Sequence, residues 1–227
     1  MDRRHGSIPL DERVAAQGSR TLHGYIEAVS SGSPAPGGGS VAALVGALAA
    51  GLGSMIANMT IARKKDPATV PTELTEAVTL LGDATRRLVD LSAQDELAYE
   101  QYIQATRLPK ASEAELQTRK AAQQDALLVA ADVPLAVAEL CRTTLLTLTP
   151  VARLGTRHAL ADCSVGAWLA VAAAHAALIN VRTNAAMMGD PHRSRSYTER
   201  ADAIEVDLDP LKAEVLAIVA DRNAPAS

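Results

Sequence analysis

The sequence predicts an all-α protein, a single-domain helical bundle of about six helices with one glycine- and alanine-rich helix at its centre. Aromatic residues make up 2% of the 227 residues, phenylalanine is absent, and the apolar content is 48%. Much of that apolar content is alanine, which has the highest helix propensity, whereas strands favour β-branched and aromatic residues. In addition, no segment alternates apolar and polar residues with the period of a strand.

The first residues are expected to lie outside the bundle. Residues 1–20 are polar and charged and lack the apolar core of a signal peptide, so we expect a disordered lead-in followed by one helical domain over residues 21–223. The first helix is predicted over residues 22–29, because the glycine- and proline-rich stretch 30–39 must end it.

Residues 41–62 predict one long apolar helix, long enough to cross a bilayer. Its apolar residues are largely alanine and glycine, Ser54 and Asn58 interrupt it, and no second span or aromatic belt accompanies it. We therefore expect a core helix that is buried on all sides.

This helix also carries a stripe of minimal side chains at spacings of four, three and four residues: Gly46, Ala50, Gly53 and Ala57. Each glycine costs a helix about 1 kcal/mol relative to alanine, so close packing should offset it. The stripe predicts that a second helix, from this chain or from another copy, presses against it. Chance drift in an alanine-rich helix is the alternative.

Local signals set the bounds of the later helices. Pro71 suits the first turn of one helix, and Ser112 with Glu115 forms a capping box that opens the next. These helices are predicted over residues 71–106, 113–148, 162–188 and 194–222, with a loop at 149–161.

The charge balance and the cysteines exclude several classes of partner. The net charge is −4 and the basic residues form no long block, which argues against duplex nucleic acid and against an anionic membrane. Cys141 and Cys163 stand far apart without metal-ligand spacing and are interpreted as small buried hydrophobes in a reducing compartment. We expect a cytoplasmic protein without a metal site.

The segment Ser33-Pro-Ala-Pro-Gly-Gly-Gly-Ser40 leads directly into the apolar helix. Successive glycines expose backbone N–H groups, and a helix N-terminus carries partial positive charge, so the segment suits a carboxylate, a phosphate or a polar heterocycle. It lacks the lysine of a phosphate-binding P-loop and no strand precedes it. From these residues alone, a ligand loop and a plain linker are equally consistent with the sequence.

Asp95 is the foremost candidate for chemistry. It continues the apolar stripe of the helix predicted over 71–106, so its carboxylate should face the interior, where desolvation would raise its pKa. The alternative is a structural carboxylate paired with a basic residue such as Arg86 or Arg142.

Three other polar positions are candidates with simpler alternatives. Asn180 and Asn184 lie one turn apart on an otherwise apolar helix, and buried amides there must bind other helices or a ligand. Asp162 stands where the same helix begins, and capping that helix would be sufficient to explain it.

The segment Pro34–Ala43, followed by the alanine/glycine helix, by Asn58-Met-Thr and by a basic Arg63-Lys64-Lys65, resembles the formiminotetrahydrofolate cyclodeaminase / methenyltetrahydrofolate cyclohydrolase family. The resemblance extends over about residues 22–220 through further landmarks, which are Leu108-Pro-Lys, Asp132-Val-Pro-Leu, Gly155 with Asp162, Asn180-Val, Asn184 and Asp190. The chain departs from the family pattern at Thr156, Ala161 and Leu97, where asparagine, serine and glutamate are common.

The resemblance implies a folate one-carbon enzyme with Asp95 and Asp162 as catalytic residues and no cofactor beyond the tetrahydrofolate substrate. It further implies that Gly37, Gly38, Gly39, Ser40, Asn180 and Asn184 bind substrate, and that Arg63, Lys64 and Lys65 hold its anionic glutamate tail. The cyclohydrolase reaction is preferred over cyclodeamination because the chain carries no formiminotransferase half. A non-catalytic folate-binding helical dimer is the alternative outside enzymes, and the small-residue stripe together with the family indicates a homodimer.

Overall fold

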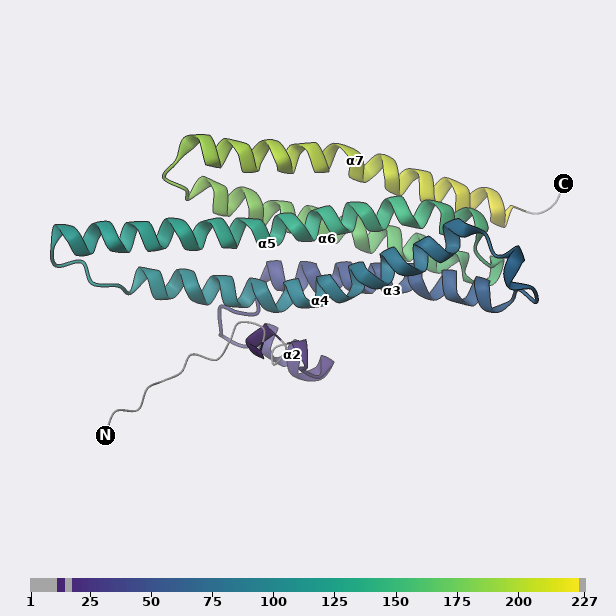
Figure 1. Ribbon diagram of the computed structural model, residues 1–227, viewed down its shortest axis with the longest axis horizontal. Coiled ribbons are helices and arrows are strands. Elements are labelled where there is room, and N and C mark those ends of the chain that lie inside the picture. Colours follow the sequence, from purple (N-terminus) through teal and green to yellow (C-terminus); the bar gives the residue numbers. More distant parts are fainter. Residues whose placement is uncertain (1–11, 15–17, 225–227) are drawn as a thin grey trace.

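The computed structural model describes residues 12–14 and 18–224, and within these residues it contains helices and no strand (Figure 1). The predicted all-α class is confirmed. Short 3₁₀ turns lie at Pro67–Thr69 and Arg157–Ala159. The helices are α2 (Leu22–Val29), α3 (Gly38–Ala62), α4 (Thr72–Thr106), α5 (Glu113–Leu154), α6 (Leu160–Ala186) and α7 (Pro191–Asn223).

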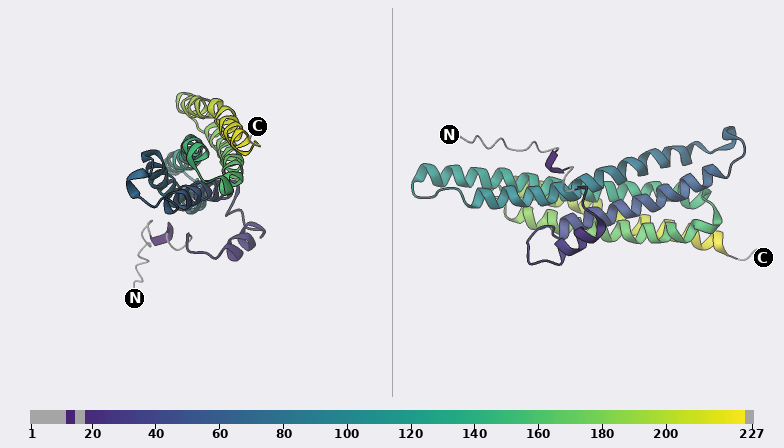
Figure 2. Two further views of the ribbon diagram at one scale, coloured as in Figure 1. Left: turned by 90° about the vertical axis from the view of Figure 1, so that its right-hand side faces the viewer. Right: turned by 90° about the horizontal axis from the view of Figure 1, so that it is seen from below.

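Four of these helices form a ring around the core. α3 packs on α4, α4 on α5, α5 on α6, and α6 returns onto α3, while α7 lies in the groove between α5 and α6. The long helices run side by side along the length of the molecule, and α2 lies outside the bundle that they form (Figures 1 and 2). No residue of α2 is buried.

Two predicted boundaries in the middle of the chain are wrong. Helix α5 continues to Leu154, through Pro150, and most of the predicted loop 149–161 is therefore helical. Helix α6 begins at Leu160, so Asp162 lies inside its first turn instead of capping it, and the N-cap residue Ala159 makes no side-chain cap. The burial of Val151 and Ala152 extends the helix, because apolar contacts there outweigh the local preference for a turn.

Other helix starts are shifted by one to three residues. Helix α3 begins at Gly38, inside the glycine run, and Pro71 is the N-cap of α4. Helix α7 begins at Pro191, because the Asp190 carboxylate accepts hydrogen bonds from the next two free N–H groups. The capping box of Ser112 and Glu115 forms as predicted.

The glycine stripe of α3 packs closely, as predicted, but against side chains of the same chain. A Cβ on Gly46 would lie 2.7 Å from the Cys141 sulfur, and one on Gly53 would lie 2.7 Å from Leu148 Cδ2. Both neighbours belong to α5, so the stripe faces the interior and gives no argument for a second copy. The close backbone approach occurs instead at Gly166 of α6, where a Cβ would lie 3.3 Å from the Ala49 carbonyl oxygen.

The prediction that α3 is buried on all sides is wrong. Leu48, Met55 and Met59 are 57%, 40% and 38% exposed along its outer face. By length and composition, α3 and the segment Arg157–Ala186 would each suffice to span a membrane, so the expectation that no second span accompanies α3 is wrong. About half of each lies buried inside the bundle (56% and 50%), as in the core helices of water-soluble proteins.

Part of the predicted disordered lead-in 1–20 makes defined contacts. Residues 1–11 and 15–17 lie outside the described residues. Arg13 forms an ion pair with Glu100 of α4, and Arg20 forms one with Glu96, one turn earlier on the same helix. These contacts attach the start of the chain to α4. Cys141 and Cys163 are buried free thiols, as predicted.

Candidate active site

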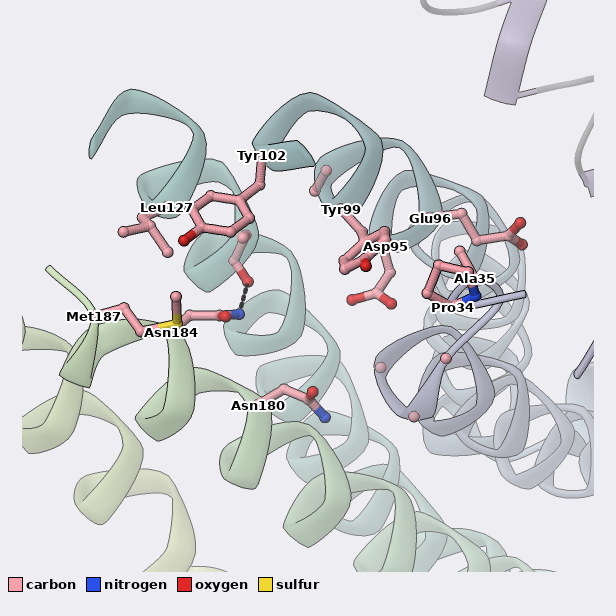
Figure 3. A pocket seen from close by; sticks show the side chains of 15 residues that line it. Pro34, Ala35, Asp95, Glu96, Tyr99, Tyr102, Leu127, Asn180, Asn184 and Met187 are labelled. Atoms are coloured by element: carbon pink, nitrogen blue, oxygen red, sulfur yellow. Dashed lines mark hydrogen bonds between the residues drawn. The ribbon is translucent and has the colours of Figure 1, made fainter. Parts of the chain in front are cut away.

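A pocket of about 350 Å³ opens where α3 begins, within the range of small-molecule sites. Its walls come from the loop before α3 and from the neighbouring parts of α4, α5 and α6 (Figure 3). Its lining includes the glycines before and at the start of α3 and the polar and aromatic side chains of α4 and α6, namely Gly37, Gly38, Gly39, Asp95, Glu96, Tyr99, Tyr102, Asn180 and Asn184.

Asp95 sits against the first turn of α3. The backbone N–H of Ser40 donates a hydrogen bond to its carboxylate, and a Cβ on Gly39 would lie 2.2 Å from Oδ1. Only glycine at position 39 therefore leaves room for this carboxylate. The anion at the glycine loop is therefore the Asp95 carboxylate of the protein itself. Arg86 and Arg142, which were considered as partners of Asp95, instead form ion pairs with Asp83 and Asp207.

Burial raises the pKa of Asp95 from 3.8 to about 6. The Ser40 N–H opposes this change because it stabilises the ionised form, and the neighbouring Glu96 charge adds to it by repulsion. A carboxyl with a pKa near 6 can both accept and return a proton close to neutral pH, which is the requirement for general acid–base work.

Two tyrosines line the α4 side of the pocket. Tyr99 and Tyr102 follow Asp95 by four and seven residues, so the three side chains lie on one face of the helix (Figure 3). Neither tyrosine was among the predicted site residues, although helical periodicity places both on the face that carries Asp95. An aromatic ring beside a carboxylate offers a flat surface for a ligand ring and attracts a positive charge.

Two amides from α6 face the tyrosines across the pocket. The Asn184 Nδ2 donates to the Ala130 carbonyl oxygen of α5 at 2.6 Å, and the Asn180 Nδ2 donates to the Ala176 carbonyl oxygen at 2.9 Å (Figure 3). The reverse orientation of either amide would bring two oxygens together. In each side chain the amide nitrogen donates to a main-chain carbonyl oxygen. The amide oxygen can therefore accept a hydrogen bond from a ligand.

Among the described residues that line this pocket, the charged side chains are Asp95 and Glu96. Glu96 is 4% exposed, and both of its oxygens accept hydrogen bonds from Arg20, which lies outside the pocket lining. The cavity therefore favours a cationic or neutral ring over an anion.

Four predicted site residues lie far from this pocket. Arg63, Lys64 and Lys65 follow the last turn of α3, and a 1.5 Å rise per residue sets Arg63 roughly 36 Å from Gly39. Asp162 lies in the first turn of α6, roughly 27 Å along the helix from Asn180. Arg63 instead donates to Thr156 at the connection before α6. Within one copy of the chain, these residues cannot act on a ligand held by Asp95.

The other predicted residues come together. Gly37, Gly38 and Gly39 line the pocket with Asn180 and Asn184. Ser40 contributes its N–H to Asp95, while its hydroxyl points away into a buried network. Leu97, which departs from the family pattern, is a core residue. In the described part of the chain, no group of three or more His, Cys, Asp or Glu side chains is arranged to hold a metal ion.

The fold and the pocket together define a class: a helical-bundle protein with one desolvated carboxyl facing a pocket for a flat, polar ring. A family model described as Formiminotransferase-cyclodeaminase matches residues 21–203. The chain belongs to this family of folate one-carbon enzymes.

Three relatives illustrate the match. A methenyltetrahydrofolate cyclohydrolase of Methylorubrum extorquens is 34% identical over 76% of this chain and 83% of its own length. A formimidoyltransferase-cyclodeaminase of Gallus gallus is 30% identical over 91% of this chain but only 38% of its own length. The crystal structure of formiminotetrahydrofolate cyclodeaminase from Thermotoga maritima superimposes with a TM-score of 0.78 at 27% identity, covering 89% of this chain and 97% of that one.

Proposed function

We propose that the protein is a methenyltetrahydrofolate cyclohydrolase, which converts 5,10-methenyltetrahydrofolate and water to 10-formyltetrahydrofolate. The observation that carries this proposal is Asp95, a desolvated carboxyl with a pKa of about 6 in a pocket whose charged lining is acidic. The substrate is a cation, with its charge spread over N5, the methenyl carbon and N10. A carboxylate attracts that charge and can also take a proton from the attacking water.

The ring is proposed to lie between the tyrosine and amide walls. Tyr99 and Tyr102 suit stacking against a flat cationic heterocycle. The free amide oxygens of Asn180 and Asn184 suit the N–H donors of the pterin edge, because their nitrogens already bind main-chain carbonyls. Neither wall offers a cation to repel the substrate.

The chemistry follows in two steps. Asp95 accepts a proton as the oxygen of water bonds to the methenyl carbon, which gives a neutral tetrahedral carbon between N5 and N10. The carboxyl then returns the proton to N5 as the carbon–N5 bond breaks, and loss of the remaining hydroxyl proton to solvent completes the N10-formyl group. The overall change is addition of one water and release of one proton. The substrate carbon is already electrophilic, so we propose that the reaction requires no cofactor.

Ammonia-releasing cyclodeamination of 5-formiminotetrahydrofolate is the second candidate, because two of the relatives described above carry that activity in their names. It passes through a similar tetrahedral carbon bearing nitrogens and would use the same carboxyl. The Methylorubrum relative, of which the chain covers most of the length, favours the cyclohydrolase.

The test is a rate measurement on purified protein. Loss of the near-ultraviolet absorbance of methenyltetrahydrofolate should be accelerated by the wild type and not by Asp95→Ala. A parallel assay with 5-formiminotetrahydrofolate, following its conversion to the absorbing methenyl compound, separates the two reactions. Equal, accelerated rates for wild type and Asp95→Ala would refute the role of Asp95. No acceleration by the wild type with either substrate would refute the assignment and leave a folate-binding helical protein without turnover.

We further propose a cytoplasmic homodimer that binds neither nucleic acid nor membranes. The net charge of −4 supports the absence of nucleic-acid and anionic-membrane contacts. The dimer is supported by the outer face of α3, where Leu48, Met55 and Met59 are exposed, and by Val165 on the adjoining helix α6, which is 48% exposed. Exposed apolar side chains gathered on adjoining helices are typical of an interface. Sedimentation should give a dimer for the wild type and a monomer for Leu48→Glu combined with Met55→Glu. A monomeric wild type at micromolar concentration would contradict the proposal.

A further inference from the structure

The most deeply buried ion pair at the site joins the start of the chain to α4. Glu96 is 4% exposed, and its two oxygens lie 3.2 and 2.9 Å from the two terminal nitrogens of Arg20. A bidentate arginine is the partner that best compensates a carboxylate removed from water. Removal of one partner from such a pair leaves an uncompensated buried charge.

The same glutamate belongs to a buried hydroxyl network. The Ser40 hydroxyl lies 2.8 Å from the Tyr25 hydroxyl, 2.8 Å from the Ser92 hydroxyl and 3.5 Å from Glu96 Oε1. Ser40 is fully buried, and its backbone N–H binds Asp95. One residue of α3 therefore connects both carboxylates.

We propose that Arg20 is a positioning residue for Asp95, because its guanidinium neutralises the adjacent buried Glu96 and so allows Asp95 to ionise. The inference rests on the proposed function, in which Asp95 must be ionised to accept a proton from water. Arg20 does not line the pocket, and its positive charge reaches Asp95 across Glu96.

The electrostatic surroundings of Asp95 make this dependence direct. From α4, the titratable groups that share its pocket are Glu96, Tyr99 and Tyr102; the pocket-lining residues from α5 and α6 are uncharged, and α3 contributes the Ser40 N–H. Burial is the main cause of the raised pKa of Asp95, and the Glu96 charge adds to it by repulsion. Arg20 is the cation paired with Glu96. Without Arg20, two neighbouring carboxylates would share one desolvated site, and such pairs resist double ionisation.

The experiment follows the carboxyl of Asp95 directly, by carbon-13 NMR titration of the folded protein labelled at aspartate, with no substrate present. In Arg20→Gln, the titration midpoint of Asp95 should rise by about one pH unit or more, since a nearby charge typically moves a pKa by 1–3 units. The pH at which kcat/KM falls on the acidic side of its profile should rise by the same amount. At pH 5 the kcat/KM of Arg20→Gln should therefore be about tenfold lower than that of the wild type. An unchanged or lowered midpoint would overturn the proposal.

A second variant separates charge from packing. Removing both charges in Arg20→Gln/Glu96→Gln should return the midpoint to the wild-type value or below it, because no uncompensated anion remains. A midpoint that stays raised would show that Arg20 acts by packing and would overturn the proposal. If Arg20→Gln does not fold, the comparison of Glu96→Gln with the double variant replaces it: the midpoint should be lower in Glu96→Gln, and equal values would be contrary evidence.

Arg13→Gln is the matched control. Arg13 pairs with Glu100 one turn along α4, and Arg13 does not line the active-site pocket. Its loss removes an attachment of the same chain segment but should leave the Asp95 midpoint unchanged. A protein that shows these NMR shifts but no turnover would refute the proposed function and retain the Arg20 coupling, so the two proposals fail separately.

Discussion

Replacing Asp95 with asparagine should strongly lower turnover and at the same time stabilise the protein above pH 6. The ionised carboxylate is held in a desolvated position, and the pKa of Asp95 is raised from 3.8 to about 6. At about 1.4 kcal/mol per pH unit, this difference corresponds to about 3 kcal/mol of unfavourable free energy in the folded, ionised state. Because Asp95 is only partly buried and solvent screens part of the cost, we expect a gain of about 1–3 kcal/mol for Asp95→Asn at pH 8.

The sign of the pH dependence follows from proton binding. Between pH 4 and pH 6 the folded wild type holds a proton on Asp95 that the unfolded chain has lost, so the stability contributed by this group falls as the pH rises through that window. The asparagine variant lacks this slope. The difference in the free energy of unfolding between the variant and the wild type should therefore grow from pH 4 to about pH 6 and then remain constant.

Urea unfolding followed by circular dichroism at pH 4.5, 6 and 8 measures this difference, at one protein concentration because oligomerisation would otherwise change the apparent stability. The turnover number should fall by a factor of about 10² to 10⁴, the usual contribution of general acid–base catalysis. A constant stability difference across the three pH values would refute the desolvation argument. Retained turnover would refute the role of the carboxyl.

Three further changes test the geometry. Gly39→Ala should lower kcat at least about 100-fold, because the new methyl displaces the Asp95 carboxylate. The melting temperature should change little, since alanine favours the helix by about 1 kcal/mol. Full activity would contradict the observed contact. Gly53→Ala should destabilise the fold by about 1–3 kcal/mol in urea unfolding, since its Cβ would lie 2.7 Å from Leu148. Lys64→Ala should change KM less than about twofold for mono- and polyglutamylated substrate, because the length of α3 separates it from Gly39 by roughly 38 Å. A large increase would mean that a second copy brings it to a pocket.

The helices were largely predictable because their signals are local. The capping box at Ser112 and the proline and glycine boundaries of α2 and α4 act within a few residues. The errors arose where tertiary contacts override such signals. Helix α5 passes through Pro150 because buried residues follow it. Helix α6 begins at Leu160, two residues earlier than predicted, so Asp162 lies in its first turn and not at its cap.

The site was predictable only in part, because a pocket joins residues from separate helices. Asp95 was found from helical periodicity, and the glycines were found from their run. Periodicity gives the face of a helix but not the level along the bundle. Arg63 was assigned to the same ligand as Gly39 from the family resemblance and the charge of a folate tail, although the two residues lie at opposite ends of α3. The pairing of Arg20 with Glu96 spans 76 residues, and no local pattern signals it.

The contact between Gly39 and Asp95 also has an evolutionary consequence. A side chain at position 39 and a carboxylate at position 95 exclude each other sterically, so each residue is constrained only while the other is kept. A lineage that lost the aspartate would be free to replace the glycine, and it would gain helix stability by doing so. Homologues in which positions 39 and 95 have both changed should therefore be those without catalytic activity. In an alignment of the family, these two positions would identify such homologues without an assay.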